Sequence, residues 1–221
     1  MFYMIRGLLT PPEVARMREF GERLHFVDGR VSNPHSQVKQ NLQVDNADPG
    51  YVESSRIVAD AFNRSREFQD FAMPKRYAPP LLCKYQVGMK YGVHGDAAFI
   101  RTGNVIVRSD LSCTVFIADP ASYQGGELTS HLGGPALSIK GQPGDAVVYP
   151  STTLHEVRPV TAGIRLVSIT FIESYVQEEG RRDILYELGE VLALEGSKMD
   201  WLNRTRLATA RENLMRMWSI T

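Results

Sequence analysis

The middle of the sequence, from Pro79 to Ser174, consists of short runs rich in β-branched and aromatic residues, which Gly, Pro and Asp separate. Turn-forming residues recur about every ten residues, and no segment of helical length lies between the runs. This pattern predicts an antiparallel β-sandwich or barrel rather than a parallel sheet. The runs are PPLLCKYQVG, DLSCTVFIAD, PALSIKG, DAVVYPS, LHEVRPV and IRLVSITFIES.

Helical patterns precede this β-rich region. Thr10-Pro-Pro-Glu13 has the spacing of a capping box, and apolar residues follow it at helical intervals. Apolar residues between 52 and 62 predict a second helix, which ends before the Met73-Pro74 pair because the residue before a proline is biased away from helix.

Helical spacing returns from about Val176 and is interrupted near Gly196, which predicts two packing helices at the end of the chain. We expect their apolar faces to cover the flank of a sheet, and Trp218 is a candidate subunit contact. The fold class is thus mainly β with flanking helices (α+β), in one structural unit. Its parts are an N-terminal helical segment, the β-core and a C-terminal helical extension, at residues 1–76, 77–176 and 177–221.

The charge balance excludes some partners. Lys plus Arg number 25 and Asp plus Glu number 25, so the formal net charge is zero. Because no global positive field exists, we expect no nucleic acid and no membrane partner, and a small or local one instead. The 221 residues, 43% of them hydrophobic, suffice for one sizeable core.

The segment MFYMIRGLLT lacks the long apolar stretch and cleavage site of a signal peptide, and no apolar run is long enough to span a bilayer. We therefore expect a cytoplasmic protein. Cys83 and Cys113 lie in apolar surroundings without CxxC spacing. This context indicates reduced core thiols rather than a disulfide or a metal site.

The stretch YGVHGDAAFI places His94 and Asp96 two residues apart, hence on one face of an extended backbone. The pair can be half of a metal site or a surface ion pair. A second histidine, His155, follows an apolar run that ends at Pro150. Two histidines and one carboxylate are the facial ligand set of non-haem Fe(II) oxygenases, which leaves coordination positions open, whereas a structural zinc needs a closed tetrahedral set.

Arg165 lies ten residues beyond His155. If Thr161-Ala162-Gly163 forms a three-residue hairpin loop, Val160 pairs with Ile164, and the arginine shares a face with the histidine. A guanidinium that points inward among apolar residues needs an anion, and a carboxylate suits its fork. The alternative is an ion pair with a protein acid, either Glu156 or Glu173.

Tyr85 and Tyr91 are predicted on the strand that leads to His94, and either hydroxyl can reach a bound carboxylate. Core tyrosines with satisfied hydroxyls are the alternative. His25 and His35 have no acidic partner at ligand spacing, and His131 stands beside glycines as expected of a loop or rim histidine, so we assign these three no metal role.

The order His94-Gly-Asp96, then His155, then Arg165 resembles a known family, and so do the segments RSDLSCTVFIADPASYQGGEL and GDAVVYPSTTLHEVRPVTAGIR. The family is that of the PKHD-type hydroxylases, bacterial members of the prolyl-4-hydroxylase-like superfamily of Fe(II)/2-oxoglutarate dioxygenases. The likeness is dense from Pro79 to Ser174 and reaches into VKQNLQVD and QEEGRRDILYEL.

The resemblance implies a double-stranded β-helix barrel of the jelly-roll or cupin-like type. It implies that His94, Asp96 and His155 bind Fe(II), that Arg165 binds the distal carboxylate of 2-oxoglutarate, and that L-ascorbate serves as reductant. The implied activity is that of an oxidoreductase, a dioxygenase that uses O2 to hydroxylate an unidentified substrate with release of succinate and CO2.

Members of this family often carry Asn directly after the metal-binding Asp, whereas Ala97 follows here. An amide can orient a carboxylate, and alanine cannot. The tract from Gln37 to Asp45 is family-like and polar enough to fold over the barrel mouth. We therefore predict a substrate role for Asn41 and Gln43, with a solvated loop as the alternative.

Two other functions fit the same residues. A cupin-like barrel can bind a metal and a carboxylate for sensing without turnover, and a zinc hydrolase can use two His and one Asp with an activated water. Arg165 favours the dioxygenase, because a hydrolase does not require a bound dicarboxylate as co-substrate. The sequence names neither the prime substrate nor the oligomeric state, and a homo-oligomer is one expectation.

Overall fold

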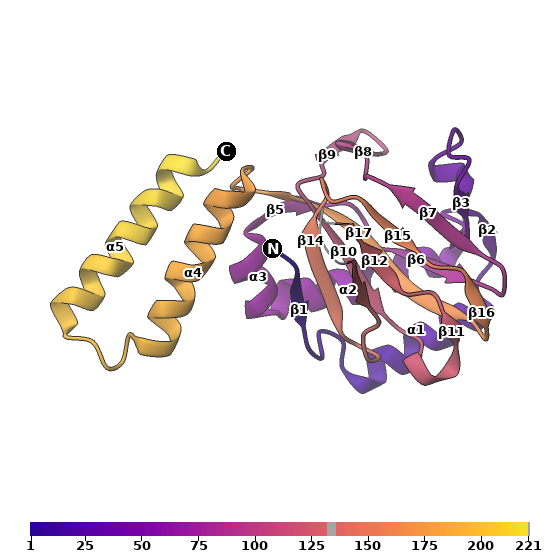
Figure 1. The fold of residues 1–221 in the computed structure, drawn as a ribbon, viewed down its shortest axis with the longest axis horizontal. Helices are drawn as coiled ribbons and strands as arrows, with labels where there is room; N and C mark the ends of the chain where they lie inside the picture. The colour runs from indigo at the N-terminus through magenta and orange to yellow at the C-terminus, as the bar shows by residue number, and fades with distance from the viewer. Residues whose placement is uncertain (132–135, 221) are drawn as a thin grey trace.

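The computed structural model describes residues 1–131 and 136–220, and helices flank two β-sheets that face each other (Figure 1). The strand pairs in the described residues are antiparallel. This architecture confirms the predicted fold class, mainly antiparallel β with flanking helices. Pro135, which begins the predicted run PALSIKG, lies outside the described residues.

Three helices form the N-terminal part: α1 (Pro11–Arg23), α2 (Pro49–Arg64) and α3 (Arg66–Ala72). The predicted capping box is present, since the Thr10 backbone N–H donates to Glu13 Oε2 at 2.8 Å. The expected single second helix is two helices instead. Ser65 interrupts it with an extended backbone, and its Oγ accepts from the Phe68 N–H at 3.2 Å as the cap of α3.

The larger sheet has the order β1-β14-β10-β17-β6-β4-β2, and β5 also pairs with β17. Its central strand β10 is buried along its whole length. On β10, Leu111, Cys113 and Val115 face the core under the helices, while Phe116 faces the smaller sheet. The strands are β1 (Tyr3–Ile5), β2 (Phe26–Asp28), β4 (Leu42–Val44), β5 (Pro74–Tyr77), β6 (Leu81–Tyr85), β10 (Leu111–Phe116), β14 (Ala146–Pro150) and β17 (Arg165–Ser174).

The smaller sheet has the order β13-β12-β15-β7-β3. Its apolar side chains, among them Leu128 and Val157, pack against Cys83, Tyr85 and Val167 of the larger sheet. Its strands are β3 (Lys39–Gln40), β7 (Lys90–His94), β12 (Leu128–Ser130), β13 (Leu137–Ile139) and β15 (His155–Val157). Two short ribbons complete the core, β8 (Phe99–Thr102) with β9 (Val105–Arg108), and β11 (Gln124–Gly125) with β16 (Val160–Ala162).

Two short 3₁₀ turns lie between strands. The first, η1 (Gly29–Ser32), follows β2, and the second, η2 (Pro120–Ser122), follows β10. In both turns an aspartate at the N-terminal end, Asp28 or Asp119, accepts a backbone N–H two residues later. This is the local side-chain pairing that favours turns over strands.

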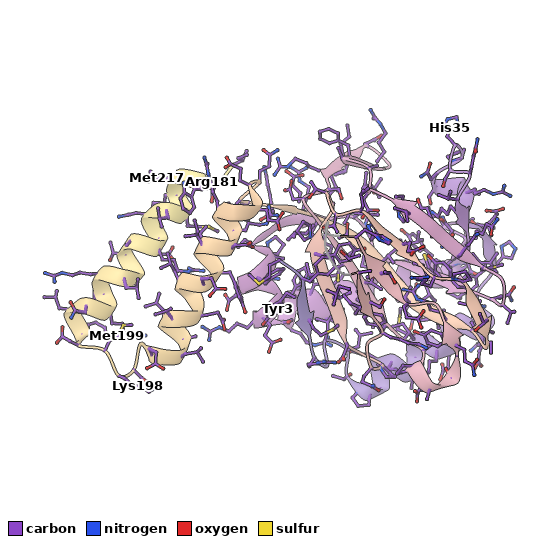
Figure 2. All side chains as sticks on the ribbon, viewed as in Figure 1. Tyr3, His35, Arg181, Lys198, Met199 and Met217 are labelled. Atoms are coloured by element: carbon purple, nitrogen blue, oxygen red, sulfur yellow. The ribbon has the colours of Figure 1, made fainter. Side chains whose placement is uncertain are left out.

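The predicted C-terminal helices are α4 (Glu179–Glu195) and α5 (Trp201–Trp218), and they project from the β-core as an antiparallel pair (Figure 1). Helix α4 buries Leu185 and Tyr186 and packs mainly on α3, and Tyr186 also contacts Tyr3 of the edge strand β1. Helix α5 packs mainly on α4. Met217 is 74% exposed on α5 (Figure 2). In the described residues, no helix combines the length and apolar character needed to cross a bilayer.

Candidate metal centre and cavity

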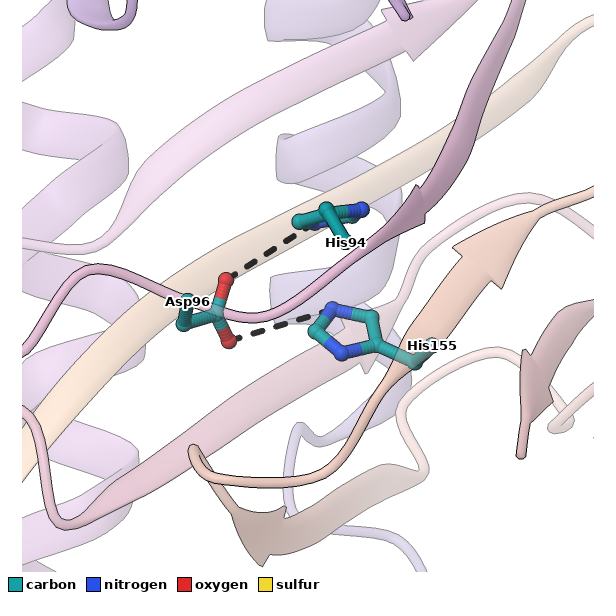
Figure 3. Close-up of side chains that lie close together, drawn as sticks. All are labelled: His94, Asp96 and His155. Atoms are coloured by element: carbon teal, nitrogen blue, oxygen red, sulfur yellow. Dashed lines mark ion pairs between the residues drawn. The ribbon is translucent and has the colours of Figure 1, made fainter. Parts of the chain in front are cut away.

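The side chains of His94, Asp96 and His155 lie close together at the smaller sheet, in the cavity that it shares with the larger sheet (Figure 3). His94 ends β7, Asp96 lies in the loop just after it, and His155 begins the neighbouring strand β15. The His94 Nε2–Asp96 Oδ1 and His155 Nε2–Asp96 Oδ2 distances are both 3.8 Å, and one donor atom from each residue lies within 4.8 Å of the others. Two nitrogen donors and one oxygen donor therefore face a common point, as a metal ion requires.

Backbone carbonyls orient both imidazoles. His94 Nδ1 lies 2.7 Å from the Gly92 carbonyl oxygen, and His155 Nδ1 lies 2.9 Å from that of Thr153. Because a carbonyl only accepts, each Nδ1 carries a proton, and Nε2 is the ring nitrogen of each histidine that faces Asp96 and can bind a metal. Burial, with the nearby His155, lowers the pKa of His94, which favours the neutral form that ligates metals.

Ser112 is a residue of this site that sequence reasoning missed. Its Oγ donates to Asp96 Oδ2 at 2.5 Å, and it also lies 2.7 Å from Ser151 Oγ, which accepts from Ser109 Oγ at 2.8 Å. A serine on β10 thus contacts the Asp96 carboxylate, while Ala97, the next residue along the chain, has no polar side chain to do so. The available signal was Ser112 and Thr114, two polar residues at strand period within an apolar run.

A β-bulge brings Tyr91 onto the His94 ring. His155 pairs with His94 and Val157 pairs with Tyr91, so two steps along β15 match three along β7. The Tyr91 and His94 rings stack with centroids 3.5 Å apart. The prediction that Tyr85 and Tyr91 share one strand is wrong, because Tyr85 ends β6 in the larger sheet.

Arg165 is 1% exposed, and its Nε has no hydrogen-bond partner in the described part of the chain. It begins β17 opposite Tyr85 of β6, with its Cζ 4.8 Å from the centroid of that ring. The alternative of a protein acid as partner is wrong. Glu173 Oε2 lies 3.1 Å from Arg76 Nε, and Glu156 Oε1 lies 3.3 Å from His131 Nε2.

The hairpin reasoning behind this arginine was also wrong. Gly163 has the expected left-handed φ of +69°, but β16 pairs with β11, and β17 joins β10 and β6 in the larger sheet. His155 and Arg165 therefore lie on facing sheets rather than on one hairpin. They nevertheless line the same cavity of about 780 Å³, together with His94, Asp96, Ser112, Tyr85 and Tyr91.

Asn41 and Gln43 also line this cavity, and each is 4% exposed. The alternative of a solvated loop is wrong for them, because β3 and β4 occupy this tract and pair with β7 and β6. Lys39 of β3 lines the cavity as well and was missed. The buried position of these polar residues depends on strand pairing that their own sequence did not reveal.

The remaining histidines and the cysteines lie outside the metal centre. His25 Nδ1 lies 3.3 Å from Asp45 Oδ2, and His131 contacts Glu156. Cys83 and Cys113 are buried free thiols, which confirms their predicted reduced state. Burial raises the pKa of Cys83 to about 11.

Known proteins resemble this chain along nearly its whole length. A family model described as the 2OG-Fe(II) oxygenase superfamily matches residues 80–173. A PKHD-type hydroxylase from Sphingopyxis alaskensis is 48% identical over 218 residues, which cover 99% of each chain. PKHD-type hydroxylase YbiX from Escherichia coli is 38% identical over 224 residues, which also cover 99% of each.

Among solved structures, a prolyl hydroxylase from Trichoplax adhaerens in complex with a hypoxia inducible factor peptide matches with a TM-score of 0.55 at 15% identity. The match covers 83% of this chain and 86% of that one, and it supports the expected jelly-roll fold. The 48% identity to a PKHD-type hydroxylase over nearly the full length shows family membership and not only a shared fold. The chain therefore belongs to the PKHD-type hydroxylases, which are Fe(II)- and 2-oxoglutarate-dependent dioxygenases.

Proposed function

We propose that this dioxygenase binds Fe(II) through His94 Nε2, His155 Nε2 and the Asp96 carboxylate. The three donors lie close together on one side of a common point, which fits a facial set that leaves positions open for a co-substrate and O2. A closed zinc site needs a fourth protein ligand, and the metal-ligand group found in the described residues has these three members.

Arg165 binds the distal carboxylate of 2-oxoglutarate in this proposal. The single observation that carries it is the position of a buried, incompletely paired guanidinium on the sheet that faces the metal ligands, inside one cavity. A carboxylate would supply the missing acceptor with two parallel hydrogen bonds. Tyr85 lies against this guanidinium and contributes a hydroxyl to the same end of the cavity.

Ferrous iron and 2-oxoglutarate, when bound, supply O2 activation, in which one oxygen atom enters succinate as CO2 leaves and the other hydroxylates the substrate. The chain orients these reactants. Arg165 fixes one end of the diacid, and the carbonyls of Gly92 and Thr153 hold both imidazoles in the ligating tautomer. Tyr91 covers one face of His94 and limits its contact with water.

Several expectations accompany this proposal. L-Ascorbate as reductant, a cytoplasmic location and a homo-oligomer stay predictions. Asn41 and Gln43 stay candidate substrate contacts, supported by their burial at the cavity wall. Tyr91 stays a candidate co-substrate contact, although its hydroxyl also accepts from Asn33 Nδ2 at 3.4 Å.

The test is formation of succinate from 2-oxoglutarate by the purified protein with Fe(II) under air. We expect stoichiometric succinate and CO2, dependence on O2, and loss of both products when a chelator removes the metal. A sensor would bind 2-oxoglutarate without forming succinate, and a zinc hydrolase would be restored by Zn²⁺ rather than by Fe(II). Either result would contradict the proposal.

Replacing Ser112 with alanine should weaken metal binding while leaving the three ligands in place. The Ser112 hydroxyl fixes one oxygen of Asp96, and removing such an orienting contact typically costs about 10-fold or more in metal affinity. Titration with Mn²⁺ followed by electron paramagnetic resonance measures the dissociation constant. Ser168→Ala is the matched control, since it removes a buried hydroxyl that is not part of the cavity.

A further inference from the structure

Lys39 is a buried cation in the cavity that contains the metal centre. Its side chain comes from β3 at the edge of the smaller sheet and is 7% exposed over the whole residue. Lysine is almost never buried at this level without an acidic partner. In residues 1–131 and 136–220, however, the structure has no ion pair to Lys39 Nζ within 4.0 Å.

The groups in direct contact with this ammonium are polar but uncharged, and the carboxylates of Asp28 and Asp96 act on it from beyond ion-pair distance. Nζ donates to Ser32 Oγ at 2.7 Å and lies 5.5 Å from the centroid of the Tyr91 ring. Asp28 pairs with Arg30 at 2.6 Å, and Asp96 belongs to the metal centre. One hydroxyl and one aromatic face use only part of the capacity of an ammonium group, which has three N–H donors.

Lys39 is held next to the metal centre by strand pairing. It lies directly opposite Tyr91 in the antiparallel pair of β3 and β7, and Tyr91 stacks on His94. Arg165 enters the cavity from the larger sheet, so the two cations are attached to different sheets. Only one of them is needed for the distal carboxylate of 2-oxoglutarate, and the other is therefore available for a second anion.

We propose that Lys39 binds an acidic group of the prime substrate, and that the substrate class is therefore compounds carrying a carboxylate or a phosphate near the hydroxylated carbon. This inference rests on the proposed function of the same cavity. A substrate anion would pair the buried ammonium directly, which neither Asp28 nor Asp96 does. Asn33, which also lines the cavity, presents a side-chain amide from the adjoining loop as a further donor.

The test uses small anions as probes, because they carry the recognised group without the rest of a substrate. The protein is loaded with Mn²⁺ and with the 2-oxoglutarate analogue N-oxalylglycine, which occupies the Arg165 end of the cavity. Paramagnetic relaxation of the phosphorus of inorganic phosphate and of the carbon of ¹³C-acetate then reports anions bound close to the metal. The anion that relaxes more strongly indicates whether the substrate group is a phosphate or a carboxylate.

We expect enhanced relaxation of at least one anion with the wild-type protein, and weakening of its binding by about tenfold or more in Lys39→Met. Lys39→Arg should retain binding because it keeps the charge. Lys90→Met is the matched control, since Lys90 is an exposed lysine on the strand paired with β3. Methionine keeps the apolar stem of the lysine, and unchanged Mn²⁺ affinity verifies that each variant is folded.

Equal relaxation in wild-type protein and Lys39→Met would overturn this inference, as would no relaxation of either anion in the wild type. A raised KM for 2-oxoglutarate in Lys39→Met would also overturn it, by assigning the lysine to the co-substrate. Failure of the proposed function would look different. In that case the protein would not bind Mn²⁺ with N-oxalylglycine or form succinate, whichever residue is at position 39.

Discussion

Succinate formation should fall by about 1,000-fold or more in Asp96→Ala, because the variant loses the only anionic ligand of the proposed iron site. The two remaining donors are neutral imidazoles, and their 3.8 Å contacts to the carboxylate disappear. The assay measures succinate from 2-oxoglutarate with saturating Fe(II). A folded variant that retains wild-type turnover would rule out Asp96 as a ligand.

A second readout for Asp96→Ala does not depend on turnover. A metal that binds only the folded state raises the unfolding temperature, and at a concentration of 100 dissociation constants it stabilises by about 2.7 kcal/mol. We expect Mn²⁺ to stabilise the wild-type protein in this way and to leave Asp96→Ala unchanged. Asp60→Ala, at an exposed position of α2, is the matched control and should behave as wild type.

Arg165→Gln should raise the KM for 2-oxoglutarate by about 30-fold, since hydrogen bonds to a charged partner contribute about 2 kcal/mol. Glutamine keeps a polar, uncharged side chain at this buried position, so the fold should persist. Steady-state kinetics at saturating Fe(II) give the KM. Arg158→Gln is the control, because Arg158 is half exposed and its Nε lies 3.5 Å from Glu156.

The same variant should also lose discrimination between co-substrates. Wild-type protein is expected to use 2-oxoglutarate far better than 2-oxobutyrate, which lacks the distal carboxylate that Arg165 would hold. In Arg165→Gln the two compounds should become similar, because neither finds a cation at that end of the cavity. If the variant still prefers the diacid as strongly as wild type does, another group binds that carboxylate.

The sequence correctly predicted those helices and strands that are indicated by residues close together in the chain. The capping box at Thr10, the short β-runs and the two C-terminal helices depend on residues near one another in the chain, and all appear in the structure. The break at Ser65 was not foreseen. The Ser65 side chain accepts a hydrogen bond at the start of the next helix, which ends the preceding one. The spacing of apolar residues carries no information about such a cap.

Long-range pairing was where sequence reasoning failed. The loop near Gly163 was read as a hairpin turn because its glycine suits a left-handed backbone, and the glycine does adopt that backbone. A turn residue such as Gly163, however, indicates only where the chain bends and not which strands pair afterwards. The long strand β17 pairs with β10 and β6 instead, since there it is buried between the helices and the smaller sheet.

By itself, the sequence determined which donor groups are present, because residue identity and spacing specify them: an imidazole and a carboxylate two residues apart, a second imidazole, and a guanidinium. Only the tertiary structure decided which groups meet. The bulge on β7, the pairing of β3 with β7 and the facing of the two sheets bring Ser112, Lys39 and Arg165 to one cavity. These contacts join segments far apart in the chain, where side-chain packing and backbone pairing, not local preference, set the geometry.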